Sequence, residues 1–289
     1  MPRLKNTSSK NRKASKSKKL VQSVLRIGKQ PESLIRCPEC SLTYSLDAAR
    51  DVATHENYHD LHLRGRKWPS QWGQVVAHFP SMLQSSTPSS IINVSASRLR
   101  SGAQRSSSDI LGTEQIIVIC PENKHEVRAT LEILKIVNDE LRAPHDENSF
   151  WSGISGPGRI ENECRKAPNG KAFVYVKNSR AVGVITAEYL DVGDKRGRWM
   201  VLDTSQIVSQ VSPDVRLGIS RIWVCRKQRG LGIATRLLEA ARLHSILGTE
   251  LAKWQMAWSQ PSESGAKLAK TYNSVLHQKS GKLIIPCYI

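Results

Sequence analysis

Negative charge is what this sequence most plainly lacks. Asp and Glu number 25 against 43 Lys and Arg in 289 residues, which leaves a net charge of +18 at pH 7. An excess of this size favours nucleic acid, chromatin or an acidic protein surface as a partner, although it can also simply aid solubility. Long apolar runs are missing too. No stretch approaches the ~18 residues of a membrane-spanning helix and no signal-peptide pattern is present, so a soluble intracellular protein is expected.

Residues 1–30 contain no acidic residue at all: they carry ten Lys or Arg and neither Asp nor Glu. Such a composition cannot bury enough apolar surface to fold alone. Residues 1–32 are therefore predicted to form a disordered basic tail for nuclear import or non-specific DNA contact. In the segment "QSVL", Gln22 and Leu25 have the spacing of a peptide that binds the groove of a DNA sliding clamp. Taken alone, this tetrapeptide is explained more simply as ordinary tail sequence.

Cysteine is scarce as well: the six in this length do not indicate a disulfide scaffold, and they suggest a reducing compartment. Cys37, Cys40, His55 and His59 follow the pattern C-x2-C-x14-H-x3-H. Two thiolates on a tight turn and two imidazoles one helical turn apart can converge tetrahedrally on one Zn²⁺. Residues 33–65 are predicted to form a small ββα-like zinc finger, with the metal supplying much of its folding free energy.

The helix expected in this finger carries Asp47, Asp51 and Glu56, with Arg50 as its permanent cation. A helix that reads DNA needs side chains able to reach the bases, and an acidic helix does this poorly. A structural or protein-docking role is favoured over sequence readout, and contact with DNA stays open. The serine-rich residues 66–111 are predicted to be a flexible linker to a second domain at 112–289.

The second domain alternates strand and helix patterns. Strands are expected in "EQIIVIC", "GRWMVL", "LGISRIWVC", "KWQMAW" and "KLIIPCYI", and a hairpin is expected through Asn178 and Ser179. One helix follows the first strand and ends before Pro144, and a second runs from Ile233 to about Leu247. This order indicates an α/β or α+β domain with a mixed sheet flanked by helices.

A glycine-rich loop, "RKQRGLG", precedes the second helix. The loop lacks the third glycine of a dinucleotide-binding fingerprint and the Gly-Lys-Ser/Thr of a Walker loop, which excludes both. What remains is Arg229-x-x-Gly232-x-Ala234, at a helix start whose free N–H groups and dipole bind phosphate oxygens. Gly230 and Gly232 would allow an anion to approach the backbone closely. The loop suits a pyrophosphate, while a simple turn into a helix accounts for the two glycines equally well.

This loop resembles the coenzyme A pyrophosphate motif, Q/R-x-x-G-x-G/A, of the GCN5-related N-acetyltransferases. The segments "GISRIWVC", "RGRWMV", "APHDEN", "AWSQP" and "SGKLIIPCYI" are similar to the fungal cohesin acetyltransferases, which establish sister-chromatid cohesion. The resemblance covers the finger and the second domain, but not the serine-rich linker.

The resemblance implies the GCN5-related N-acetyltransferase fold, acetyl-CoA as cosubstrate, and Zn²⁺ in the finger. It also implies that the chain is an acyltransferase, a protein-lysine N-acetyltransferase. The implied reaction is N6-acetylation of lysines on the SMC-type ATPase head of cohesin during DNA replication, in the nucleus and on chromatin. Because a clamp-binding motif precedes the finger in this family, the resemblance assigns Gln22 and Leu25 to a sliding-clamp contact.

The resemblance further implies coenzyme contacts along one strand, its loop and a later segment. They fall on Ile222, Trp223, Val224, Arg229, Gly230, Leu231, Gly232, Ile233, Ala234, Thr235, Ser262, Glu263 and Ser264.

The general base is the least determined part of the site. A lysine ammonium, with an ordinary pKa near ~10.4, must lose a proton before it attacks a thioester. Ser220 matches a family serine implicated near the substrate amine. Animal relatives carry Asp where this chain has Gln260, and an amide cannot accept a proton as a carboxylate does. Ser220 is preferred as a participant, with Glu263, Glu188 and a water relay as the other candidates.

Three further residues near the implied reaction have open or secondary roles. The backbone N–H around Val224 is expected to stabilise the oxyanion. Tyr272 could donate a proton to the leaving thiol, as tyrosines do in many acetyltransferases, or pack in the core. Cys225, at a strand end beside the loop, is expected to pack rather than to act as a nucleophile, because amine and thioester can react directly in a ternary complex.

Two rival functions are considered. One is a zinc-finger adaptor that binds DNA or chromatin and carries an inactive acetyltransferase fold; such a domain has no physical need for open glycines in the loop. The other is a histone acetyltransferase, in which the same loop would be found. The substrate lysines and the oligomeric state do not follow from the sequence.

Overall fold

A computed structural model describes residues 34–79, 114–145, 169–190, 196–208 and 211–289. The basic tail with Gln22 and Leu25, and residues 80–111 of the predicted linker, lie outside these ranges. The chain divides into two compact units, residues 1–55 and 56–289, with the boundary inside one helix. Within the described ranges, no helix is both long enough and apolar enough to cross a membrane.

The finger segment has the predicted order of two strands and a helix. β1 (Leu34–Arg36) pairs antiparallel with β2 (Thr43–Ser45), and α1 (Ala49–Arg64) follows. The connecting turn is tight: the Cys37 N–H donates to the Leu42 carbonyl at 2.9 Å, and Ser41 adopts a left-handed conformation with φ 62°. The ββα-like arrangement expected from the cysteine and histidine spacing is therefore confirmed.

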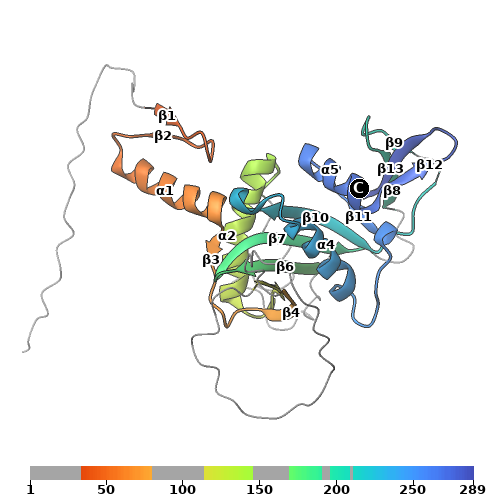
Figure 1. Cartoon of the computed structure of the whole chain (residues 1–289), viewed down its shortest axis with the longest axis horizontal. Helices are drawn as coiled ribbons and strands as arrows, with labels where there is room; N and C mark the ends of the chain where they lie inside the picture. Colours follow the sequence, from red (N-terminus) through yellow and green to blue (C-terminus); the bar gives the residue numbers. More distant parts are fainter. Residues whose placement is uncertain (1–33, 80–113, 146–168, 191–195, 209–210) are drawn as a thin grey trace, which may run out of the picture. The chain divides into compact units, whose positions relative to one another are not determined.

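Eleven strands of the described residues form one mixed sheet, drawn in Figure 1. Its main path has the order β4-β5-β6-β7-β10-β11-β13-β8-β9, while β3 pairs with β7 and β12 with β13. The strands are β3 (Arg66–Lys67), β4 (Gln74–Phe79), β5 (Glu114–Val118), β6 (Gly170–Lys177), β7 (Arg180–Tyr189), β8 (Gly197–Val201), β9 (Ile207–Val208), β10 (Leu217–Val224), β11 (Met256–Trp258), β12 (Val275–His277) and β13 (Lys282–Tyr288). The pairs β10–β11 and β11–β13 are parallel, which confirms the predicted mixed sheet.

The centre of the sheet is a long hairpin buried on both faces. Residues 172–176 of β6 and 181–187 of β7 are all buried, as expected for strands covered on both sides. The predicted turn is confirmed: Asn178 and Ser179 both have positive φ, 49° and 55°, which matches the twist of the flanking strands.

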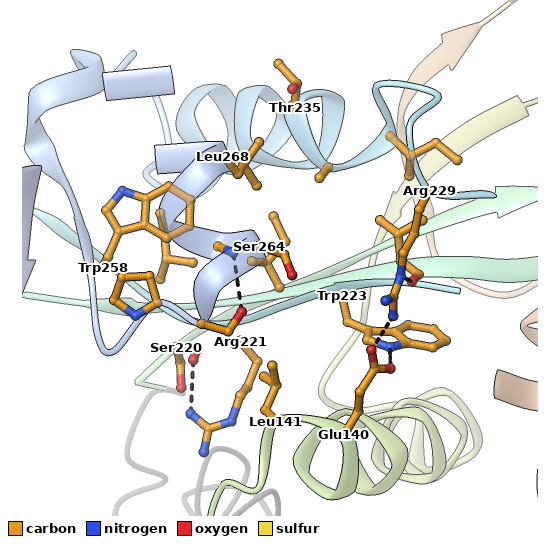
Figure 2. Close-up of a pocket in the computed structure, with 18 of the residues that line it drawn as sticks. Glu140, Leu141, Ser220, Arg221, Trp223, Arg229, Thr235, Trp258, Ser264 and Leu268 are labelled. Carbon is orange, nitrogen blue, oxygen red and sulfur yellow. Dashed lines mark hydrogen bonds and ion pairs between the residues drawn. The ribbon is translucent and has the colours of Figure 1, made fainter. Parts of the chain in front are cut away.

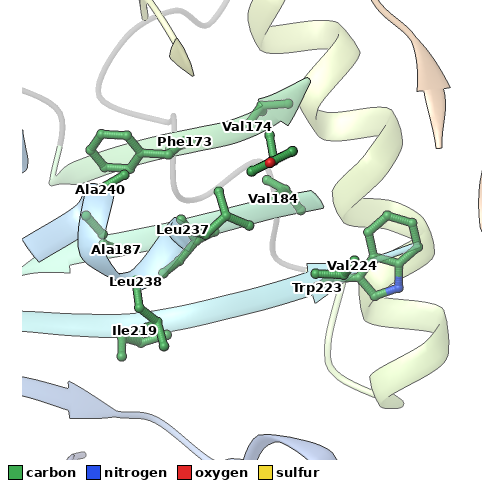
Figure 3. Close-up of a cluster of buried hydrophobic side chains, with 14 of the residues drawn as sticks. Phe173, Val174, Val184, Ala187, Ile219, Trp223, Val224, Leu237, Leu238 and Ala240 are labelled. Carbon is green, nitrogen blue, oxygen red and sulfur yellow. The ribbon is translucent and has the colours of Figure 1, made fainter. Parts of the chain in front are cut away.

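Helices cover this central hairpin. α2 (Lys124–Leu141) and α4 (Ile233–His244) both pack on β7 and β10, and α5 (Glu263–Asn273) packs on β13. The side chain of Asn123 caps the start of α2 by accepting the His125 and Glu126 N–H groups. Figure 3 shows Leu237 and Leu238 of α4 packed on the sheet among buried side chains of β6, β7 and β10. Two predicted helices are thus confirmed, with α4 ending at His244 rather than near Leu247.

Two elements differ from the prediction. Residues 66–79, assigned to the flexible linker, include β3 and β4; β4 pairs with β5 along its length, and Trp68 is only 2 % exposed. Aromatic burial and ladder hydrogen bonds order a stretch whose neighbouring serines suggested flexibility. Helix α5 was not predicted. Its signals are Ser262, which caps the helix by accepting the Gly265 N–H at 3.3 Å, and the buried face formed by Ala269 and Tyr272.

Candidate active site and metal centre

A cavity in the described residues opens where β10 and β11 separate. It has a volume of about 380 Å³ and is lined by the second half of β10, the loop before α4, the chain after β11 and the first turns of α5 (Figure 2). β10 pairs in parallel with β11 only as far as Ile219, opposite Trp258. Beyond that point β11 turns away toward α5, so one edge of β10 faces the cavity.

Ser220 occupies the position at which the two strands part. The register of β10 on β7 steps from Ile219 opposite Ala187 to Arg221 opposite Thr186, so Ser220 is the extra residue of a β-bulge. The Ser259 hydroxyl donates to the Ser220 carbonyl at 3.2 Å, and this carbonyl also accepts from Arg221 Nη1 at 3.0 Å. The bulge places Ser220 on the wall of the cavity.

The backbone of Val224 points into the same cavity. The N–H of Cys225 donates to Val182 in β7 at 2.8 Å, so the N–H and C=O of the preceding residue face the opposite side. Accordingly the Val224 carbonyl accepts from Arg229 Nε at 2.8 Å, on the cavity side. The Val224 N–H lies on that side too, where it can donate to an oxyanion.

The loop before α4 has the geometry of an anion site. Gly230 and Gly232 have φ values of 81° and 77°, and a Cβ at either would meet no described atom within 4 Å. Gly232 is the N-cap of α4, whose first-turn N–H groups and dipole favour a negative charge. Arg226 and Lys227, in the short 3₁₀ turn Arg226–Gln228, add positive charge next to this loop.

Ser220 and eleven of the thirteen predicted coenzyme contacts line the cavity. These eleven are Ile222, Trp223, Val224, Arg229, Gly230, Gly232, Ile233, Ala234, Thr235, Ser262 and Ser264.

Two loop residues depart from their expected positions. The Leu231 side chain is 55 % exposed and does not line the cavity. Arg229 does line it, but its guanidinium is committed elsewhere: Nη2 donates to Glu140 Oε1 at 2.5 Å and Nε donates to Val224. Arg229 therefore organises the protein around the loop, and it is not a free charge for a phosphate. Sequence reasoning missed Glu140 because α2 lies far away along the chain.

Glu263 does not reach the cavity. It lies in the first turn of α5, its side chain is 87 % exposed, and it forms an ion pair with Lys267 at 2.9 Å. The hydrogen bond from Lys267 lowers the pKa of the Glu263 carboxyl. Ser262 and Ser264 line the cavity, but the helical phase turns the side chain between them toward solvent. The structure therefore does not bring Glu263 to the cavity with the other predicted site residues.

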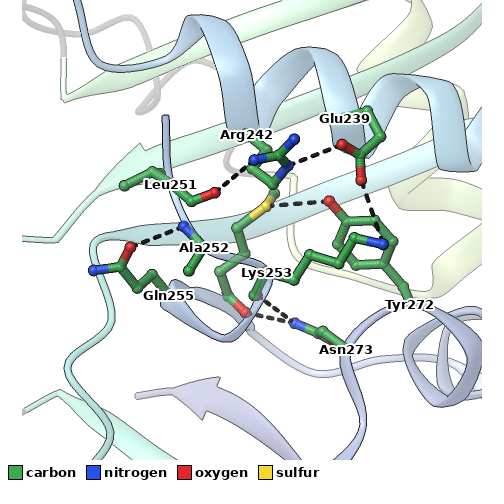
Figure 4. A network of polar contacts seen from close by, with 9 residues as sticks. Glu239, Arg242, Leu251, Ala252, Lys253, Gln255, Tyr272 and Asn273 are labelled. Atoms are coloured by element: carbon green, nitrogen blue, oxygen red, sulfur yellow. Dashed lines mark hydrogen bonds and ion pairs between the residues drawn. The ribbon is translucent and has the colours of Figure 1, made fainter. Parts of the chain in front are cut away.

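Tyr272, in α5, also lies away from the cavity, in a polar network with residues of α4 that Figure 4 shows. Its hydroxyl donates to Met256 Sδ at 3.6 Å, and it lies near Glu239 and Arg242. Burial raises the pKa of Tyr272 well above its ordinary value, and the Glu239 carboxylate adds to the rise. The role of proton donor to a thiol is not supported here, and core packing explains the residue.

Two candidates remain, Cys225 and Glu188. Cys225 is fully buried, and burial raises the pKa of its thiol to about 11, which favours packing over nucleophilic chemistry. Glu188 is half-buried in β7 and does not line the cavity. However, the buried hydroxyl of Tyr288 interacts with both Ser220 and Glu188. Ser220 and Glu188 are thus connected through Tyr288, a residue that the sequence analysis did not single out.

The metal centre lies in the finger segment. The ligand atoms of Cys37, Cys40, His55 and His59 all lie within 4.8 Å of one another. Tyr44 of β2 stacks on the His55 ring with centroids 3.9 Å apart, which orients that imidazole. The Cys40 backbone lowers the pKa of Cys37 to about 7 by hydrogen bonding, so the thiolate that a metal needs forms readily. Two sulfur and two nitrogen donors in this arrangement fit tetrahedral Zn²⁺.

Two family models match these two parts of the chain. The zinc-finger of acetyl-transferase ESCO matches residues 22–61, and the ESCO1/2 acetyl-transferase matches residues 213–278. The second match spans β10, the glycine loop, α4, β11 and α5, which together carry the cavity. The predicted zinc finger and acetyltransferase domain are both supported by these matches.

Close relatives share nearly the whole length of the chain. It is 52 % identical to N-acetyltransferase ECO1 of Eremothecium gossypii, over 97 % of this chain and 98 % of that protein. It is 42 % identical to N-acetyltransferase ECO1 of Saccharomyces cerevisiae, over 96 % of this chain and 98 % of that protein. The solved xEco2 acetyltransferase domain bound to a K105-CoA conjugate is 23 % identical, with a TM-score of 0.43, covering 61 % of this chain and 92 % of that one.

Proposed function

This chain belongs to the ECO1/ESCO family of N-acetyltransferases, and from that premise we propose that it acetylates lysine Nζ atoms on the SMC-type ATPase head of cohesin, with acetyl-CoA as the acetyl donor. The proposed setting is the nucleus during S phase, where the modification establishes sister-chromatid cohesion. The observation that carries the proposal is the cavity in which the free edge of β10, its bulge at Ser220 and the open start of α4 meet.

Different groups of the chain bind different parts of acetyl-CoA in this cavity. The N–H groups at the start of α4 bind the diphosphate, because the side chains that would block them are absent at Gly230 and Gly232. The free edge of β10 binds the acyl arm as an added strand would bind. The N–H of Val224 faces the cavity and donates to the oxygen that gains charge as the amine attacks the thioester.

Ser220 is the group we assign to the substrate amine. The incoming ammonium must lose a proton, and we assign Ser220, on the wall of the cavity, as the first group it meets. Tyr288 and Glu188 lie near Ser220 and are the proposed onward route for the proton. Gln260 also lines the cavity, but its amide can only orient the amine or a water. In this proposal the carboxylate that receives the proton is Glu188, which does not line the cavity.

The finger and the tail are assigned to partners. The zinc finger provides a folded docking surface, and Gln22 and Leu25 bind the sliding clamp, which would bring the enzyme to replicating DNA. The basic tail contributes nuclear import and non-specific attraction to chromatin. A variant with both Gln22 and Leu25 changed to Ala should lose binding to purified clamp while its turnover on cohesin heads in solution is unchanged.

The test is a direct assay of substrate choice. Purified protein and acetyl-CoA are incubated with recombinant cohesin ATPase heads or with core histones, and acetyl-lysine is mapped by mass spectrometry. The proposal expects modification of the cohesin head, abolished by Gly232→Asp. Faster modification of histones would favour the histone acetyltransferase, and no modification of either would favour the inactive adaptor.

A further inference from the structure

One carboxylate joins the end of β10 to the loop before α4. Glu140, in the last turn of α2, accepts Trp223 Nε1 at 2.7 Å through Oε2 and Arg229 Nη2 at 2.5 Å through Oε1. Figure 2 shows the carboxylate between the indole and the guanidinium. Arg229 also donates through Nε to the Val224 carbonyl at 2.8 Å. Three consecutive hydrogen bonds therefore connect the helix, the strand end and the loop.

The surroundings strengthen these bonds. The Glu140 side chain is only 24 % exposed, and it is paired with a permanent cation, so both hydrogen bonds to it are stronger than neutral ones. Behind it lies the buried His62 of α1, with Nδ1 at 3.7 Å from Oε2. Burial lowers the pKa of His62, so this imidazole does not compete with Arg229 for the negative charge.

The loop needs such a restraint. Arg229 directly precedes Gly230, and two glycines within three residues leave the backbone free to adopt many conformations. When a loop becomes ordered only on binding, the entropy cost of ordering it lowers the affinity for the ligand. A loop that is already held in place does not have this cost. The hydrogen bonds of Glu140 hold the residue at which the flexible part begins.

We propose that Glu140 is a positioning residue for coenzyme binding, acting through Arg229 and Trp223 to hold the loop and the end of β10 in the binding geometry. The inference rests on the proposed function, because it assumes that a diphosphate binds at this loop. It assigns a structural task to Arg229 in place of phosphate contact. It also gives α2 a role in coenzyme affinity.

The test compares Glu140→Ala and Glu140→Gln with a matched control, Glu132→Gln. Glu132 lies in the same helix and pairs with Arg66 at 2.8 Å, but it does not line the cavity. The full-length protein is titrated with CoA by calorimetry. We expect Glu140→Ala to weaken binding by roughly tenfold or more, which corresponds to about 1.4 kcal/mol. The CoA affinity of Glu140→Gln should lie between those of the wild type and Glu140→Ala, since its amide oxygen can still accept one hydrogen bond. The CoA affinity of Glu132→Gln should match that of the wild type.

A second acetyl donor separates positioning of the loop from general damage. S-acetylpantetheine keeps the arm that meets the edge of β10 but lacks the diphosphate, so in Glu140→Gln its KM should rise by a smaller factor than the KM for acetyl-CoA. An equal rise in KM for both donors would overturn the inference that Glu140 positions the loop for the diphosphate. A double-mutant cycle of Glu140→Gln with Arg229→Gln should be strongly non-additive for CoA affinity, and additive effects would contradict it.

The remaining outcomes are distinct. CoA binding by Glu140→Ala as tight as that of Glu132→Gln would overturn this inference and leave the proposed function standing. Failure of the wild-type protein to bind CoA would overturn the proposed function and this inference with it.

Discussion

Gly218 of β10 lies against the ring of Tyr288 of β13, although β11 runs between these two strands. A Cβ at position 218 would stand 2.7 Å from Tyr288 Cζ. The intervening neighbour is Ala257, also fully buried, so two small residues side by side let the ring extend across β11. The same crossing places Tyr288 near Ser220 and Glu188, both of which influence the pKa of its hydroxyl.

Replacing Gly218 with Ala should destabilise the protein by about 1–3 kcal/mol, because the added methyl group overlaps a buried ring. The measurement is chemical denaturation of wild type, Gly218→Ala, Tyr288→Leu and the double variant. Removal of the ring should make the methyl group tolerable, so the two changes should be non-additive. Strictly additive losses would show that the contact does not limit this position.

Gly232→Asp should abolish coenzyme binding by placing a carboxylate where the diphosphate is expected. Gly248→Asp is the matched control, because Gly248 has a similar φ of 71° and equally open space but lies outside the cavity. The two variants share the backbone cost, so a loss of CoA affinity of roughly a hundredfold in the first alone isolates the repulsion of like charges. Zinc content should be unchanged in both. Equal CoA affinity in the two variants would contradict the assignment.

Ser220→Ala and Glu263→Gln should differ sharply in turnover. Loss of a group that handles the substrate proton costs about a hundredfold or more, and Ser220 lies on the cavity wall. Glu263 is exposed and paired with Lys267 in solvent, so its neutral variant should keep both its stability and its rate. Steady-state kinetics with cohesin heads decides the matter. A large loss of rate in Glu263→Gln would restore that residue as the base.

Cys225→Ala should remain active. With the pKa of its thiol raised to about 11 by burial, Cys225 carries almost no thiolate at pH 8, so iodoacetamide should not modify it in the folded protein. We expect an unchanged kcat and a modest fall in Tm from the lost packing. The checks are peptide mapping after alkylation and initial rates. Rapid alkylation of Cys225, or loss of kcat without unfolding, would indicate covalent catalysis.

Cys37→Ser should remove zinc from the finger without removing the reaction. The residue supplies one of four clustered ligand atoms, and small metal-bound units lose most of their folding free energy without the metal. Elemental analysis should show loss of the metal, while Cys120→Ser, at an exposed cysteine outside the cluster, should retain it. Turnover on a short lysine peptide should be preserved. If it fell as far as in Gly232→Asp, the finger would be part of the catalytic unit.

The features that could be predicted from sequence are local in the chain. The four metal ligands lie within one short segment, and the hairpin turn at Asn178 and Ser179 is defined by its own residues. The loop at Gly230 and Gly232 likewise follows from adjacent glycines before a helix. In each case residues that are close together in the sequence meet the physical requirement, whether it is ligand spacing or positive φ.

The features that were missed depend on the tertiary fold. Glu140 meets Arg229 only because α2 and the loop are brought together by the sheet, 89 residues apart in sequence. Tyr288 reaches Ser220 across an intervening strand, which no local pattern indicates. The placement of Glu263 outside the cavity has a related cause. Its neighbours line the cavity, and only the rotation of α5 determines that its own side chain faces solvent.

The central claim is that the start of α4 binds the diphosphate of acetyl-CoA. A crystal structure of the full-length protein with acetyl-CoA tests it most directly. The account predicts diphosphate oxygens within hydrogen-bonding distance of the backbone N–H groups between Gly230 and Thr235, with the acetyl group near Val224. Density for the cofactor at any other site, with this loop unengaged, would contradict it.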